Sequence, residues 1–72
     1  MKYILIIWVC SFLNGPNCSP PATSIKTYDS WYECSQAAYA KSRQIVTKLG
    51  YAYVNENEIA TKFTCKPVGP AI

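Results

Sequence analysis

The sequence predicts a small α+β domain in which one helix packs on a three-stranded sheet and disulfide bonds supplement the core. Three observations indicate this class: an apolar N-terminal run, a segment with helical periodicity after a capping motif, and an alternating segment near the C-terminus. The chain has 72 residues, and a hydrophobic core of that size supplies only about 3 to 5 kcal/mol. We therefore expect the four cysteines to staple a single domain.

Composition excludes several classes of function. Half of the residues are hydrophobic and 15% are charged, which argues against a disordered chain. The formal net charge of +3 is mild for a dedicated nucleic-acid binder. The chain has no histidine, so it cannot build a Ser-His-Asp site, a Cys-His site or a histidine-containing zinc site. We expect no enzyme activity, no metal, no cofactor and no small-molecule substrate.

The apolar run at residues 1–13 has two interpretations. As a β-strand it is apolar on both faces, which is typical of a central strand covered on both sides. As a signal peptide it has a basic start, but the cleavage sites after Gly15 and Ala22 do not resemble A-x-A. The run is shorter than the roughly 20 residues that span a bilayer. The strand is the leading interpretation, and a cleaved signal is the alternative.

A proline-rich loop and a helix are predicted next. Residues 14–29 are rich in Asn, Gly, Pro and Ser, which indicates a loop. Ser30 and Glu33 fit a capping box, and Gly50 fits a C-terminal stop, so the helix is expected within residues 30–50. The stripe expected to face the core consists of Trp31, Cys34, Ala38, Ile45 and Leu49.

The segment 51–66 is predicted to be a strand hairpin, and residues 67–72 a tail. The first strand covers residues 51–54, and the second begins at residue 59 after a polar turn. Alternation in the second strand predicts a core face made of Ile59, Thr61, Phe63 and Cys65.

The cysteines lack the spacing of metal ligands, which favours disulfides. A right-handed parallel strand-helix-strand unit would gather all four at one end of the domain. We predict bridges from Cys34 to Cys65 and from Cys10 to Cys18, with the other two pairings open. Disulfides imply an oxidising place such as a virion exterior, the periplasm or the extracellular space. Free thiols in the cytoplasm are the alternative.

A surface of aromatic and basic side chains is a candidate interface. Tyr51 and Tyr53 alternate on the predicted first strand of the hairpin, near Lys62 and Lys66 on the second. Tyrosines beside lysines can stack nucleic-acid bases and bind phosphate groups. Tyrosines also favour half-buried strand faces for structural reasons alone, so nucleic-acid binding is the less favoured interpretation.

Several short motifs occur in order along the chain: Met1-Lys2-Tyr3, Cys10-Ser11, Cys18 in the loop, Tyr28-Asp29-Ser30-Trp31-Tyr32-Glu33-Cys34 and Lys62-Phe63-Thr64-Cys65. With these motifs the chain resembles short uncharacterised proteins encoded by marine bacteriophages and found in marine metagenomes. The resemblance covers most of the chain and brings no activity with it. It implies a phage origin and one of two roles: a small virion component, such as a capsid-stabilising protein, or a product exported to the host envelope.

The leading functional hypothesis is a non-enzymatic structural module that contacts a protein partner or assembles with itself. The first alternative is an exported periplasmic or secreted binder or inhibitor whose N-terminus is cleaved. The second alternative is a small single-strand nucleic-acid binder.

Overall fold

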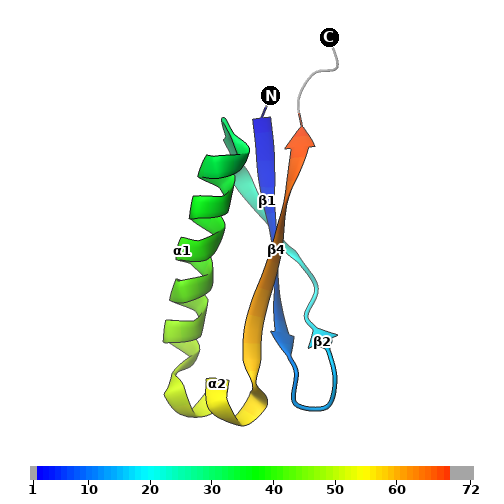
Figure 1. Cartoon of the computed structure of the whole chain (residues 1–72), viewed down its shortest axis with the longest axis vertical. Helices are drawn as coiled ribbons and strands as arrows, with labels where there is room; N and C mark the ends of the chain where they lie inside the picture. The colour runs from blue at the N-terminus through cyan, green and yellow to red at the C-terminus, as the bar shows by residue number, and fades with distance from the viewer. Residues whose placement is uncertain (1, 69–72) are drawn as a thin grey trace.

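The computed structural model describes residues 2–68, which fold into a four-stranded antiparallel sheet with two helices (Figure 1). The predicted α+β class is therefore confirmed, with one more strand and one more helix than expected. The elements are β1 (Lys2–Ser11), β2 (Asn17–Cys18), β3 (Ala22–Tyr28), α1 (Trp31–Leu49), α2 (Tyr51–Asn57) and β4 (Ile59–Val68). The molecule is elongated, with extents of 47 × 20 × 17 Å.

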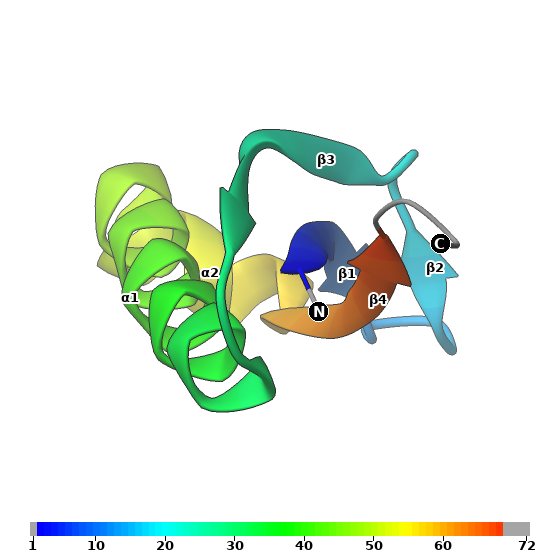
Figure 2. The ribbon, with the colours of Figure 1, turned by 90° about the horizontal axis from the view of Figure 1, so that it is seen from above.

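Strand β1 is the centre of the sheet, because every other strand pairs with it. Along one edge β1 pairs with β4 over ten residues, from Lys2 opposite Val68 to Ser11 opposite Ile59. Along the other edge it pairs with β3 and then with β2. Figure 2 shows both helices on one side of β1 and β4. The expectation that the apolar strand is covered on both sides is therefore wrong, since no helix covers its second face.

The segment 14–29 is not only a loop, because it contains β2 and β3. Strand β3 lies at an edge of the sheet and most of its side chains are exposed, so its sequence lacks the apolar alternation of a half-buried strand. Its pairing with β1 shifts register around Leu5. There the Ser24 hydroxyl accepts from the Leu5 N–H at 3.2 Å and donates to the Lys26 carbonyl at 2.8 Å, which satisfies the interrupted ladder.

The unexpected strand β3 also changes the direction of β4. Strand β3 carries the chain back along the sheet before α1 begins, so β4 runs antiparallel to β1, and the parallel strand-helix-strand unit considered from the sequence does not form. Strands β3 and β4 run in one direction with β1 between them. In this register Cys65 lies opposite Leu5, whereas Cys10 lies opposite Ala60. Cys10 is thus roughly 17 Å along β1 from the level of Cys65, and the expectation that all four cysteines gather at one end is wrong.

Helix α1 begins and ends where its capping residues predict. The Ser30 hydroxyl accepts from the Glu33 N–H at 3.1 Å, so one of the unpaired amide groups of the first turn is satisfied. At the other end Gly50 has φ of 93°, a conformation that residues with a Cβ rarely adopt. The N–H of Gly50 still donates to the Val46 carbonyl at 3.1 Å.

Residues 51–54 are helical and not a strand, which corrects the predicted hairpin. The chain turns at Gly50 and begins α2, in which the Val54 N–H donates to the Gly50 carbonyl at 3.1 Å. The Asn57 side-chain amide donates to the Tyr53 carbonyl at 3.1 Å, and Glu58 ends the helix in a left-handed conformation with φ of 48°. Helix α2 therefore connects α1 to β4. The strand that pairs with β4 is β1.

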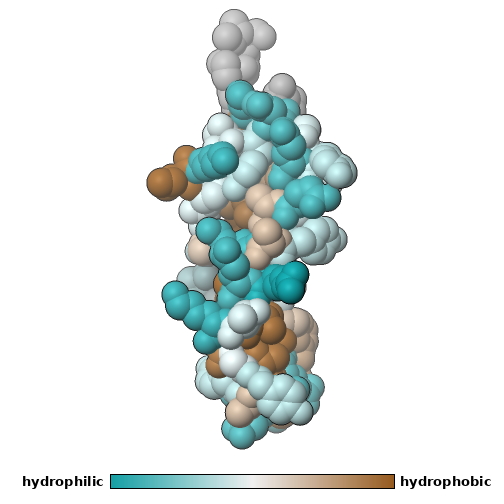
Figure 3. Space-filling model, turned by 90° about the vertical axis from the view of Figure 1, so that its left-hand side faces the viewer, coloured by the Kyte–Doolittle hydropathy of each residue, from teal (hydrophilic) through white to brown (hydrophobic). Residues whose placement is uncertain are grey.

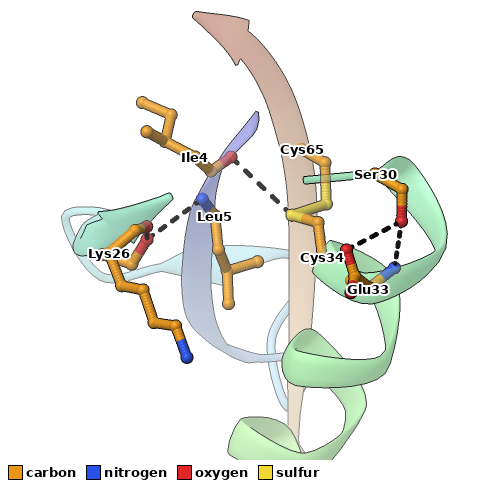
Figure 4. Close-up of a disulfide and its surroundings, with 8 residues drawn as sticks. Ile4, Leu5, Lys26, Ser30, Glu33, Cys34 and Cys65 are labelled. Carbon is orange, nitrogen blue, oxygen red and sulfur yellow. Dashed lines mark hydrogen bonds between the residues drawn. A yellow bond between two sulfur atoms is a disulfide. The ribbon is translucent and has the colours of Figure 1, made fainter. Parts of the chain in front are cut away.

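The core is small and contains a disulfide at its centre. Figure 4 shows the bridge from Cys34, in the first turn of α1, to Cys65 on β4, with Leu5 on the neighbouring strand. The two bridges join the residues that the sequence predicted, with Cα–Cα distances of 6.2 Å for Cys34 and Cys65 and 3.9 Å for Cys10 and Cys18. The buried hydrophobic residues within 2–68 are Leu5, Ile7, Cys10, Cys34, Ala38 and Cys65.

The alternation predicted for the last strand is present. Along β4 the residues of the expected core face are buried or half-buried, and the intervening ones are exposed. Thr61 on that face donates to the Ser42 hydroxyl of α1 at 2.7 Å, and the Phe63 ring packs edge-on against Tyr39 at 5.3 Å between ring centroids. The ends of the predicted apolar stripe of α1 are less covered, since Trp31 and Leu49 are exposed. Strand β4 extends to Val68, and residues 69–72 of the predicted tail lie outside the described residues.

Replacing Ser30 with alanine removes the hydroxyl that caps α1, so we expect the free energy of unfolding to fall by about 1 kcal/mol. Urea denaturation followed by circular dichroism measures the change. Gln36→Ala is the matched control, because Gln36 is exposed on the same helix and makes no capping bond. A Ser30→Ala variant as stable as the control would contradict the capping role.

Candidate functional site: the open sheet face

The side of the sheet turned away from the helices carries the candidate site. Directly opposed residues of an antiparallel pair lie on the same face, so the register between β1 and β4 identifies its members. Leu5 and Cys65 oppose each other on the helix side, and the alternate pairs therefore face the other way. We name this surface the open face; it consists of Ile4, Ile6 and Trp8 on β1 and Lys62, Thr64 and Lys66 on β4.

The open face combines a half-buried apolar strip with a basic edge. Ile4, Ile6 and Trp8 are each partly accessible, and the residues opposite them on β4 are exposed. The Lys62 ammonium lies 4.9 Å from the centroid of the Trp8 ring, a cation–π contact. Lys66 is four positions after Lys62, so the two residues lie roughly 13 Å apart along β4.

Within residues 2–68, no carboxylate forms an ion pair with Lys62 or Lys66. The four acidic residues are Asp29 after β3, Glu33 in α1, Glu56 in α2 and Glu58 at the end of α2. None of them occupies a position on β1 or β4. The face is therefore electropositive, and the ammonium groups of Lys62 and Lys66 are available to an anionic partner.

Lys2, at the start of β1, is different because it has an ionic partner. Its ammonium group pairs with the carboxylate of Asp29, which connects the start of β1 to the chain just after β3. The hydrogen bond from Lys2 and the attraction of its charge lower the pKa of Asp29 below the ordinary value. The charge of Lys2 is thus met within the chain, which leaves Lys62 and Lys66 as the basic groups of the open face.

The predicted platform of tyrosines and lysines does not form as a sheet surface. Tyr51 and Tyr53 lie on α2, with 87% and 52% of their surfaces exposed, whereas Lys62 and Lys66 lie on β4. The aromatic residue beside Lys62 is instead Trp8. The sequence reading missed Trp8 because the run around it was assigned to a strand covered on both sides. Its spacing of two and four residues from Ile6 and Ile4 is the signal that groups it with this face.

The opposite side of the molecule has another character. Figure 3 shows the face over α1, which is largely hydrophilic with a hydrophobic area over the C-terminal part of the helix. A hollow of about 420 Å³ lies between α1 and β3. Its lining has no carboxylate and consists of Leu5, Ile7, Ala22, Thr23, Ser24, Ile25, Lys26, Tyr28 and Lys41. The polar groups of this lining are the two ammonium groups of Lys26 and Lys41 and the three hydroxyls of Thr23, Ser24 and Tyr28.

The cysteines serve as covalent connections, since all four are in disulfides. Within residues 2–68 there is no group of three or more His, Cys, Asp or Glu side chains arranged to hold a metal ion. In that same part of the chain, neither helix is both long and apolar enough to cross a membrane.

Comparison with known proteins finds no match: no protein-family model, no curated protein and no solved structure is similar to this chain. The evidence on function is therefore the surface of the molecule itself.

The contribution of the Lys2–Asp29 ion pair to stability should depend on pH. Because the pKa of Asp29 is lowered in the folded state, the pair stabilises the fold above the ordinary aspartate pKa, and this contribution is lost as pH falls through the lowered value. A titration of the Asp29 carboxyl by NMR should show the lowered pKa, and Lys2→Gln should return it to the ordinary range. Lys26→Gln is the control, because Lys26 lies over Tyr28 and not against Asp29. An unchanged Asp29 pKa in Lys2→Gln would contradict the assignment.

Proposed function

We propose that this chain is a non-enzymatic, disulfide-stapled module that contacts another protein in an oxidising place, on a virion exterior or at a cell envelope. The observation that carries the proposal is the imbalance between exposed and buried apolar side chains. Among the described residues only Leu5 and Ile7 are large aliphatic side chains that are buried. Within residues 2–68, nine large hydrophobic side chains are exposed: Phe12, Leu13, Ile25, Trp31, Tyr32, Tyr39, Leu49, Tyr51 and Tyr53.

The composition of the exposed apolar side chains supports the same proposal. Tyrosine and tryptophan are enriched at protein interfaces. They supply five of the nine exposed large hydrophobic side chains within residues 2–68: Trp31, Tyr32, Tyr39, Tyr51 and Tyr53.

The disulfides support the oxidising environment. Both bridges are at bonding distance, which is compatible with a compartment that maintains disulfides. The bridge between Cys10 and Cys18 also ties β1 to β2. Removal of residues 1–15 or 1–22 would delete the strand with which β2, β3 and β4 pair. This dependence favours a product that keeps β1 over an exported binder with a cleaved N-terminus.

The proposal is tested by the length, the thiol oxidation and the stoichiometry of the natural protein. Cells or particles that make the chain are treated with N-ethylmaleimide before lysis, and the intact mass and stoichiometry are then measured in purified particles, envelope and soluble fractions. We expect a chain that carries β1, takes up maleimide only after reduction, and is present in particles or envelope in a fixed ratio to a second protein. A cytosolic thiol protein from the same sample is the control for labelling.

Two results would contradict the proposal. One is a chain with maleimide on its cysteines before reduction, because its thiols would then be free in the producing cell. The other is an oxidised chain that has no protein in constant ratio with it in any fraction.

A further inference from the structure

We propose that the open face binds an acidic segment of another protein, with apolar side chains of that segment over Ile4, Ile6 and Trp8 and carboxylates at Lys62 and Lys66. This inference rests on the proposed function and names the surface and the chemistry of the partner. The open face is turned away from both helices, and its charged side chains, Lys62 and Lys66, have the same sign.

The centre of the open face has the composition of a protein contact. Ile4, Ile6 and Trp8 form a continuous strip because they alternate along one strand. Each is half-buried, so a partner can remove a substantial apolar area from water without any rearrangement of the sheet. Such a strip, bordered by polar and charged groups, is the arrangement found in specific protein interfaces.

The basic edge of the open face, Lys62 and Lys66, favours a partner of negative charge. Lys62 and Lys66 flank Thr64 on β4, and no acidic residue of the chain lies on β1 or β4 to neutralise them. The Lys62 ammonium lies over the Trp8 ring, at one end of the strip. A second copy of this chain would bring lysines against lysines if the same faces met, which is unfavourable. Charge complementarity therefore favours a foreign acidic segment over self-association through this face.

A protein partner fits the strip better than a nucleic acid does. Single-strand binders stack successive bases on several aromatic rings, but the only aromatic side chain of the open face is Trp8. Ile4 and Ile6 present aliphatic surface, which packs against aliphatic side chains and offers no ring for stacking. Arginine, which forms the strongest bidentate contacts with phosphate, is absent from β1 and β4.

The experiment uses the full oxidised chain with Trp31→Phe, so that Trp8 is the only tryptophan. The probe is a short synthetic peptide with two glutamates spaced as Lys62 and Lys66 are, and a leucine midway between them. We expect titration to change the Trp8 fluorescence in a saturable way. The double variant Lys62→Glu with Lys66→Glu should weaken binding by about tenfold or more, and it should bind a peptide with lysines in place of the glutamates.

The matched control is Lys41→Glu with Lys48→Glu, which makes the same change of net charge at two exposed residues of α1. This control should leave the affinity unchanged within about twofold. Equal weakening in both double variants would overturn the proposal, because only net charge would then matter. The proposal would also be overturned if the glutamate peptide caused no change in Trp8 fluorescence in the Trp31→Phe protein. Tighter binding of an oligo-dT strand than of the peptide, with the same Trp8 response, would reassign the face to nucleic acid.

Failure of this proposal is distinguishable from failure of the proposed function. If the natural product is oxidised and in constant ratio with a second protein, but the peptide leaves Trp8 unaffected, the module contacts its partner through another surface. If the natural product has free thiols, the proposed function fails whatever the peptide does.

Discussion

The bridge from Cys34 to Cys65 is the constraint on which the rest of the structure depends. It joins the first turn of α1 to β4, the strand beside β1. The other two buried residues of this core cluster are Leu5 and Ala38. Burial of one leucine contributes about 1.5 to 3 kcal/mol. In the chain-entropy model, a bridge that closes 31 residues contributes on the order of 3.5 kcal/mol. The covalent link therefore contributes more than the burial of any single apolar side chain of this core.

The two faces of strand β1 have different roles. One face supplies Leu5 and Ile7 to the core under α1, and the alternate residues supply the open face. Because the period of a strand is two residues, a slip of one residue between β1 and β4 would exchange these faces. The bridge restricts such a slip on the β4 side, since it keeps Cys65 turned toward α1. The position of the core and the exposure of Trp8 are thus consequences of one register.

The sequence predicts the parts of the fold that carry strong local signals. Ser30, Glu33 and Gly50 define α1, and alternation defines the core face of β4. The cysteine pairing is also predictable, although the parallel geometry used to argue for it is wrong. Edge strand β3 carries no apolar alternation, so the direction of β4 could not be read correctly. Lys62 was identified, but its aromatic neighbour Trp8 was not, because the pairing of β4 with β1 is a long-range property.

The most direct test of the central role of the long bridge is to remove each disulfide separately and measure the free energy of unfolding in urea. We expect Cys34→Ala with Cys65→Ala to abolish the cooperative transition at 25 °C, because the helix loses its covalent attachment to the sheet. Cys10→Ala with Cys18→Ala should keep a cooperative transition and lose about 2.5 kcal/mol, the contribution of the shorter loop. A variant without Cys34 and Cys65 that unfolds cooperatively, and with more stability than the other variant, would contradict the account.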